Sequence, residues 1–302
     1  MKSLLERIAG GEILISDGAM GTFLVAQGLK PGVSPESWCV AYPEIVQAIA
    51  ESYIAAGADI IETNSFGGTF YMQREFKLAD KVVEFNSAAS RLAKAAVGVN
   101  GYVAASVGPT GQILEDEGGD ASPDDIYAAF AEQIAALAAG GADAVCIETM
   151  SSKLEAELAV KAAKTTTTLP VICTFTFDRK PTGFRTMMGV TPAKAALAAI
   201  AAGADIVGAN CGNGIANMIE ITREIRAATP GIPIIIQANA GSPTLVNGQT
   251  VFAETPEDMA SRVAELIEAG ANIIGGCCGT TPRHIAAIAE AATRTAHRPA
   301  LG

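Results

Sequence analysis

Ala56-Gly57-Ala58-Asp59-Ile60-Ile61 is a phrase that the chain repeats, with small changes, three more times. It returns as Gly140-Gly141-Ala142-Asp143-Ala144-Val145, Ala202-Gly203-Ala204-Asp205-Ile206-Val207 and Ala269-Gly270-Ala271-Asn272-Ile273-Ile274. Each copy follows an alanine-rich stretch of helical character, and its glycine stands where a helix C-terminus is commonly capped. A run of apolar and β-branched residues comes next, as at the start of a buried strand. The phrase therefore predicts the step from a helix into a strand, within a repeating βα unit.

Eight stretches are strand candidates when the chain is followed outward from these copies. They are Ile13–Ser16, Ile60–Thr63, Tyr102–Val107, Ala144–Glu148, Val171–Phe175, Ile206–Asn210, Ile234–Gln237 and Ile273–Gly276. Predicted helices lie between them, among them Ile45–Ala56, Ile126–Ala139, Pro192–Ala202 and Pro256–Ala269. Eight alternating units favour an α/β fold, a single (β/α)₈ TIM-type barrel, and we expect residues 1–302 to form that one domain. A doubly wound sheet is the alternative, although it does not usually need eight evenly spaced units.

The composition limits the classes of partner. The 302 residues are 49% hydrophobic and carry 21 basic against 32 acidic side chains, a net charge of −11. No basic patch stands out, so we expect no nucleic acid, and the acidic balance argues against anionic membranes. The first residues are charged and no apolar run approaches a membrane span, so we expect neither a signal peptide nor a transmembrane helix. Six cysteines in an otherwise ordinary chain favour a reducing compartment, and we expect the cytoplasm.

Three cysteines stand at the ends of two predicted strands. Cys277 and Cys278 lie in Gly275-Gly276-Cys277-Cys278-Gly279, and Cys211 ends Val207-Gly208-Ala209-Asn210-Cys211. Three thiolates are a ligand set for zinc, and three protein ligands leave one position open for substrate. Adjacent side chains of a strand point to opposite faces, so the two neighbours share a metal only if the chain kinks, which the flanking glycines allow. A vicinal disulfide, or three unrelated buried cysteines, are the alternatives.

Other polar residues end predicted strands at the face where such barrels carry their active sites. Asp17 and Glu148 follow apolar strands, and either can hold a cation such as a substrate amine, or instead cap a helix or join a structural hydrogen-bond network. The glycine-rich Gly18–Thr22 segment offers backbone N–H groups to an anion. Acids and N–H donors together suit a zwitterionic amino acid. We therefore expect substrate binding at Asp17, Gly18, Thr22, Thr63, Asn64, Glu148 and Asn239.

These motifs, taken together, resemble the homocysteine S-methyltransferase family, which includes the homocysteine-binding domain of cobalamin-dependent methionine synthase. The resemblance runs from Asp17 to about Ile288 and is most specific in Gly-Gly-Cys-Cys-Gly-Thr-Thr-Pro-x-His-Ile at 275–285. Further matches are Asp-Gly-Ala-Met-Gly-Thr at 17–22, Glu-Thr-Asn-Ser-Phe at 62–66, Gly-Pro-Thr-Gly at 108–111 and Asn-Ala-Gly-Ser-Pro at 239–243.

The resemblance implies a zinc-bearing barrel that methylates the thiol of homocysteine to form methionine, with a zinc-bound thiolate as nucleophile. It puts the zinc thiolates at Cys211, Cys277 and Cys278. It puts the acids that bind the amino acid at Asp17 and Glu148, and Asn239 at a residue that fills the fourth zinc position before substrate binds. The chemistry fits, because a thiol of pKa about 8.5 is deprotonated outright on coordination.

Two departures from the family pattern leave the methyl donor and acceptor open. The segment Gly212-Asn213-Gly214-Ile215-Ala216-Asn217 lacks the proline turn usual after the first cysteine, and Ala238 precedes Asn239 where many relatives carry proline. An alternative function is a substrate-specific methyltransferase that passes methyl groups to or from a separate corrinoid protein. The chain lacks the Asp-x-His-x-x-Gly corrinoid signature, so methylcobalamin would come from such a partner. A metal-storing or amino-acid-binding module is the non-enzymatic alternative, which the open coordination position disfavours.

Overall fold

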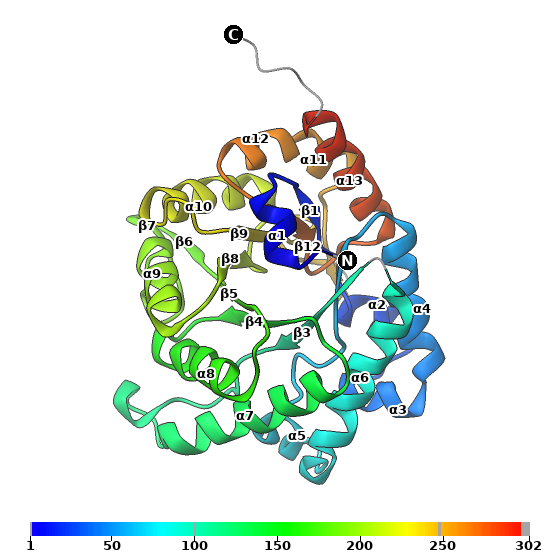
Figure 1. Ribbon diagram of the computed structural model, residues 1–302, viewed down its shortest axis with the longest axis vertical. Coiled ribbons are helices and arrows are strands. Elements are labelled where there is room, and N and C mark those ends of the chain that lie inside the picture. The colour runs from blue at the N-terminus through cyan, green and yellow to red at the C-terminus, as the bar shows by residue number, and fades with distance from the viewer. Residues whose placement is uncertain (1, 100, 247–248, 297–302) are drawn as a thin grey trace.

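A computed structural model describes residues 2–99, 101–246 and 249–296. Eight parallel strands form the barrel seen down its axis in Figure 1. They are β1 (Leu14–Ile15), β2 (Ile60–Glu62), β3 (Tyr102–Val107), β4 (Ala144–Met150), β5 (Val171–Phe175), β8 (Ile206–Asn210), β9 (Ile234–Ala238) and β12 (Ile273–Gly276). The order β1-β12-β9-β8-β5-β4-β3-β2 is joined at its two ends by a parallel bridge between Ser16 and Ile60. The predicted TIM-type barrel is confirmed.

Helices surround the barrel between its strands (Figure 1). The α-helices are α1 (Leu4–Ala9), α2 (Gly21–Ala26), α3 (Trp38–Ala41), α4 (Pro43–Ala55), α5 (Phe70–Glu75), α6 (Val82–Val97), α7 (Pro123–Ala139), α8 (Lys153–Thr166), α9 (Pro192–Ala202), α10 (Ile215–Ala228), α11 (Pro256–Ser261), α12 (Val263–Glu268) and α13 (Pro282–Ala296). Short 3₁₀ turns span Pro35–Ser37, Ala79–Lys81 and Glu115–Glu117. The helix predicted over Pro256–Ala269 is interrupted at Arg262, where φ is −106°.

The repeated phrase marks the same structural step four times. Its glycines, Gly57, Gly141, Gly203 and Gly270, all have φ between 98° and 116°, the left-handed region that glycine enters at little cost. The acid or amide two residues later accepts a hydrogen bond from a backbone N–H at the start of the neighbouring strand. The pairs are Asp59 with Ile15, Asp143 with Val103, Asp205 with Val171 and Asn272 with Ile234, at 2.8 to 3.0 Å. The phrase therefore ends a helix and fixes the register of two strands together.

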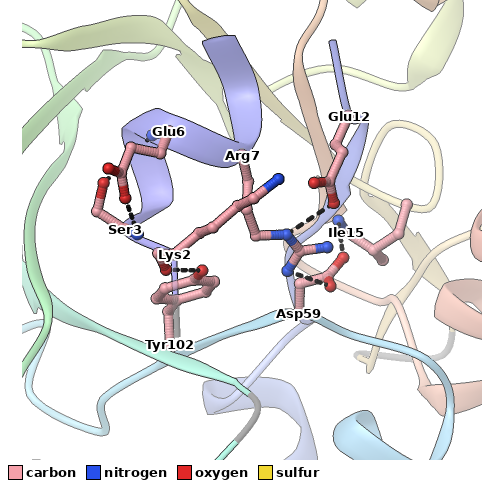
Figure 2. A network of polar contacts seen from close by, with 8 residues as sticks. All are labelled: Lys2, Ser3, Glu6, Arg7, Glu12, Ile15, Asp59 and Tyr102. Carbon is pink, nitrogen blue, oxygen red and sulfur yellow. Dashed lines mark hydrogen bonds and ion pairs between the residues drawn. The ribbon is translucent and has the colours of Figure 1, made fainter. Parts of the chain in front are cut away.

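Helix α1 closes the N-terminal end of the barrel. Leu4 and Ile8 are buried against inward-facing strand residues, and α1 lies across the barrel opening in Figure 1. Figure 2 shows how α1 is held: Arg7 donates to Asp59 at 2.8 Å and to Glu12 at 2.8 Å, while the Tyr102 hydroxyl donates to the Lys2 carbonyl. Asp59 therefore ties α1 as well as β1 and β2, and only the C-terminal end of the barrel is left to hold a site.

Two β-hairpins extend the loops that follow β5 and β9. They are β6 (Asp178–Lys180) with β7 (Gly183–Arg185), and β10 (Thr244–Val246) with β11 (Gln249–Val251). Because β8 lies between β5 and β9 in the sheet, the two hairpins flank the strand that leads to Cys211. Within the described ranges, no helix combines the length and apolar composition needed to cross a bilayer.

Candidate active site

A pocket of about 360 Å³ opens at the C-terminal ends of the strands. Eight of the residues expected from the sequence line it together: Gly18, Thr22, Thr63, Asn64, Glu148, Cys211, Cys277 and Cys278. Asp17 and Asn239 do not line it; both side chains are buried just behind, each 2% exposed. The strand ends thus gather the predicted residues in one place, although they are up to about 260 positions apart in the chain.

The three cysteines form the one group of metal-ligand type found among the described residues. All three Sγ atoms lie within 4.8 Å of one another, and the Cys211 and Cys278 sulfurs are 3.8 Å apart. Tetrahedral zinc with sulfur bonds of about 2.3 Å places two ligand atoms about 3.8 Å apart. A disulfide requires about 2.05 Å, and all six cysteines are free, so the structure contains no vicinal disulfide. The spacing of the sulfurs fits zinc.

Strand β9 holds both cysteine segments in place. Its Gln237 carbonyl accepts from the Cys211 N–H at 3.1 Å, and its Ala238 carbonyl accepts from the Cys277 N–H at 2.8 Å. Beyond the strand, the Ala240 N–H donates to the Cys278 carbonyl at 3.0 Å. These bonds bring the sulfurs together because β9 lies between β8 and β12.

The kink expected at the cysteines has two parts. Cys211 itself has φ 60°, a left-handed conformation uncommon for a residue with a side chain. Cys277 begins a tight turn, in which its carbonyl accepts from the Thr280 N–H at 3.1 Å and Gly279 takes φ 80°. This turn lets two adjacent cysteines face one point, which a regular strand forbids.

Asn239 occupies the end of β9, between the two cysteine segments. Its carboxamide contacts the Cys211 sulfur, and its Oδ1 is buried without a hydrogen-bond partner among the described residues. A buried polar atom without a partner costs free energy, so a position of this kind calls for a ligand. A metal ion held by the three sulfurs would supply that partner, which makes the donor set complete at four.

The thiols titrate as one group. Hydrogen bonds from Cys277 and Cys278 lower the pKa of Cys211 to about 3. The contact with Cys211 raises the pKa of Cys278 to about 11, and the contacts with both neighbours raise the pKa of Cys277 well above its usual value. These shifts favour a thiolate at Cys211 over one at either neighbour. Full ionisation of all three needs a positive charge between them, which a divalent metal provides.

Glu148 is aimed into the pocket by a β-bulge. The register between β4 and β5 shifts between Ile147 and Met150, and Thr149 has φ 60°. Asn210 fixes this bulge: its Oδ1 accepts from the Thr149 N–H at 2.8 Å, and its Nδ2 donates to Glu148 at 2.9 Å. Bulges beside active sites commonly redirect a side chain in this way.

Two buried carboxyls, Glu62 and Glu148, line the pocket, and a third, Asp17, is buried outside its lining. Burial raises the pKa of Asp17 to about 8 and that of Glu62 to about 7, and burial together with Glu62 raises the pKa of Glu148 well above its usual value. Among the described residues, no lysine, arginine or histidine lines the pocket. Acids that are kept neutral only by the cost of burying charge will ionise when a cation enters. The floor of the pocket is therefore acidic, with no basic side chain among the described residues beside it.

Comparison with known proteins places the chain in a family. The family model for homocysteine S-methyltransferase matches residues 14–292. The chain belongs to the homocysteine S-methyltransferase family. It is 32% identical over 312 residues to a methionine synthase of Mycobacterium leprae and 31% identical over 299 residues to one of Mycobacterium tuberculosis. These alignments cover 96% and 92% of this chain but 25% and 24% of those proteins, so the chain spans about a quarter of their length.

Solved structures show the same fold. The metallated form of the homocysteine methyltransferase MmuM from Escherichia coli superposes with a TM-score of 0.76, at 24% identity, covering 92% of this chain and 96% of that one. The oxidized form of the same protein superposes with a TM-score of 0.75. At this identity the likeness establishes the barrel architecture and leaves the chemistry to the residues of the site.

The segment that follows Cys211, residues 212–217, is held by hydrogen bonds of Asn213. Asn213, 4% exposed, donates through Nδ2 to the Phe177 carbonyl at 2.6 Å and accepts from Asn217 at 2.8 Å. Its N–H donates to the Cys211 carbonyl at 2.8 Å. Side-chain hydrogen bonds of Asn213 thus fix the turn after Cys211 without a proline.

Four residues of the site received no role in the sequence analysis. Ser106 and Asn210 both bond Glu148, and Gln237 donates to Glu62 at 2.8 Å. Each is a polar residue at an inward-facing position of an otherwise apolar strand. That interruption of an apolar run is the signal by which they could have been found, since buried polar side chains require partners.

Proposed function

We propose that this chain transfers a methyl group to the thiol of homocysteine, forming methionine, with zinc bound by Cys211, Cys277 and Cys278. The observation that carries the proposal is the 3.8 Å separation of the Cys211 and Cys278 sulfurs on the wall of a pocket whose floor is acidic. A metal-storing module would need no such floor. Family membership supports homocysteine as the acceptor. Six free cysteines suit a reducing compartment, so we place the activity in the cytoplasm.

Different residues of the pocket bind the thiol and the α-amino-acid group of the substrate. Zinc, when bound, lowers the pKa of a coordinated thiol and so supplies a nucleophilic sulfur at neutral pH. Glu148 binds the substrate ammonium, because Asn210 holds it in the pocket and an incoming cation favours its ionised form. Backbone N–H groups of the Gly18–Thr22 segment bind the carboxylate. Asn239, whose Oδ1 is buried without a partner among the described residues, would hold the metal together with the three cysteines before a thiol binds.

The methyl donor enters from outside the described chain. An anionic donor would meet a pocket without cationic side chains among the described residues, so we infer a donor that is positively charged or that is delivered by a partner protein. As the second arrangement, the chain passes methyl groups to or from a corrinoid protein that carries methylcobalamin; the match to proteins named methionine synthase supports this alternative.

Metal analysis and a methyl-transfer assay test the proposal together. We expect one zinc per chain in the wild type, loss of zinc in Cys277→Ala, and methionine formation from homocysteine with one of a panel of donors. X-ray absorption should count three sulfur neighbours without homocysteine and four with it. Equal zinc in wild type and Cys277→Ala would refute the metal site, and a count that stays at three would refute homocysteine as the ligand.

A further inference from the structure

The hydroxyl of Thr280 connects the two halves of the site. Its Oγ1 accepts a hydrogen bond from the Ala19 N–H at 3.1 Å and donates to the Cys277 carbonyl at 2.7 Å. Thr280 is 2% exposed and does not line the pocket. One side chain therefore joins the cysteine turn to the segment that begins at Gly18, and it does so without access to substrate.

Tyr53 of α4 also contacts both segments, through its hydroxyl. Its hydroxyl donates to the Ala19 carbonyl at 2.9 Å and to the Thr280 carbonyl at 3.3 Å, and its side chain is fully buried. Ala19 is thus held on both sides, its N–H by Thr280 and its carbonyl by Tyr53. The residues that follow Ala19 line the pocket, so their position relative to the cysteines is fixed by these bonds.

Two glycines are required by the closeness of this packing. A Cβ on Gly18 would lie 2.7 Å from the Thr280 Oγ1, and a Cβ on Gly276 would lie 2.4 Å from the same atom. Real Cβ atoms do not approach other atoms so closely, so the hydroxyl sits in a space that only glycines leave. The two segments are consequently in direct contact through Thr280 and have no room to slide past each other.

We propose that Thr280 is a positioning residue that sets the distance between the amino-acid-binding segment and the metal centre, and so selects homocysteine over cysteine. The inference rests on the proposed function, in which the carboxylate binds at Gly18–Thr22 and the thiol at the cysteines. Homocysteine and cysteine differ by one methylene between these two ends. If the distance between the carboxylate-binding segment and the cysteines is fixed, the affinities of the two thiols differ by about 10- to 200-fold. If that distance can vary, the site does not distinguish them.

The test is binding of homocysteine and of cysteine to the zinc-loaded full-length chain, measured by calorimetry. In Thr280→Val, which keeps the shape and loses the hydroxyl, we expect the Kd of homocysteine to rise about tenfold, since two buried hydrogen bonds are lost. The preference for homocysteine over cysteine should narrow by a similar factor, with zinc content unchanged. Thr280→Ser, which keeps the hydroxyl, should restore the wild-type preference.

Thr281→Val is the matched control. The neighbouring Thr281 hydroxyl contacts His284 at the start of α13 and does not contact Ala19. Its loss should lower the melting temperature and leave the preference between the two thiols intact. Tyr53→Phe should narrow the preference in the same direction as Thr280→Val, because it frees the other side of Ala19.

The outcomes separate the two proposals. A wild type that selects homocysteine, with a Thr280→Val variant that selects it equally well, overturns the positioning role and leaves the proposed function standing. A variant that loses affinity for both thiols by the same factor also overturns it, since this is the effect of a structural residue. A wild type that binds homocysteine no better than cysteine refutes the proposed function, and the positioning role with it.

Discussion

Replacing Glu148 by glutamine tests the binding of the substrate ammonium most directly. The carboxylate accepts from Asn210 Nδ2 at 2.9 Å and from the Ser106 hydroxyl. Glutamine keeps one oxygen for Asn210 and offers an NH₂ to the Ser106 hydroxyl, which can accept as well as donate. The pocket should therefore keep its shape, and the change removes charge alone.

The magnitude follows from two opposing effects. A hydrogen bond between charged groups contributes about 1.5–3 kcal/mol, which is about a 10- to 150-fold rise in KM when it is lost. Burial and the neighbouring Glu62 raise the pKa of Glu148, so keeping its carboxyl ionised to bind the ammonium costs free energy. That cost reduces the net gain, and we expect a rise in KM toward the lower end, about tenfold.

The assay compares KM for homocysteine, zinc content and proton release in Glu148→Gln and wild type. The wild type should release more protons than the variant on binding, because the variant has no carboxyl of raised pKa to ionise. Glu155→Gln is the matched control: Glu155 is also buried, accepts from the Thr110 N–H at 2.7 Å, and lies outside the pocket. If KM changes less than twofold in Glu148→Gln while zinc is retained, Glu148 is structural and the assignment of the ammonium site is wrong.

Three further predictions concern the metal, the pH response and the closed end of the barrel. Asn239→Ala should weaken zinc binding about tenfold in a chelator competition, and added homocysteine should restore most of it, because the thiol takes the same position. Burial raises the pKa of Asp17 from 3.8 to about 8, so between these pH values the native state keeps a proton that the unfolded chain loses. The contribution of Asp17 to the free energy of unfolding is therefore full below about pH 4 and is lost as the pH rises through about 8. Urea unfolding of Asp17→Asn should therefore depend less on pH over that interval, and an unchanged slope would contradict the buried neutral acid. Arg7→Ala should lower the unfolding free energy by about 1–3 kcal/mol, since it removes two charged hydrogen bonds, and should leave KM unchanged at the far end of the barrel.

The barrel was predictable because its signals are local and repeated. A glycine that ends a helix, followed by a β-branched strand, is visible in four copies of one phrase, and the strand bounds follow from the apolar runs. The sequence did not reveal that the acid of the phrase bonds the neighbouring strand. Asp59 and Ile15 are 44 positions apart, and only the closed barrel brings them together.

Elements without periodicity were missed. The hairpin β6–β7 consists of short, mostly exposed strands, so it has no apolar alternation to mark it. Helix α1 is six residues long, and its role depends on packing against the barrel interior rather than on its own sequence. The convergence of the three cysteines could be predicted because adjacent cysteines flanked by glycines are rare, whereas Asn210 is an ordinary polar residue whose importance lies in what it contacts.

Asn210 also explains why the two unusual backbone conformations of the site occur together. Thr149 and Cys211 both have φ 60°, and each such conformation in a residue with a side chain costs about 1–3 kcal/mol. Asn210 immediately precedes Cys211 and bonds both the N–H and the hydroxyl of Thr149. Its side chain thus stabilises the Thr149 conformation, and its backbone leads directly into the Cys211 conformation. The backbone that turns Glu148 into the pocket and the backbone that places the Cys211 sulfur near Cys278 therefore meet at Asn210.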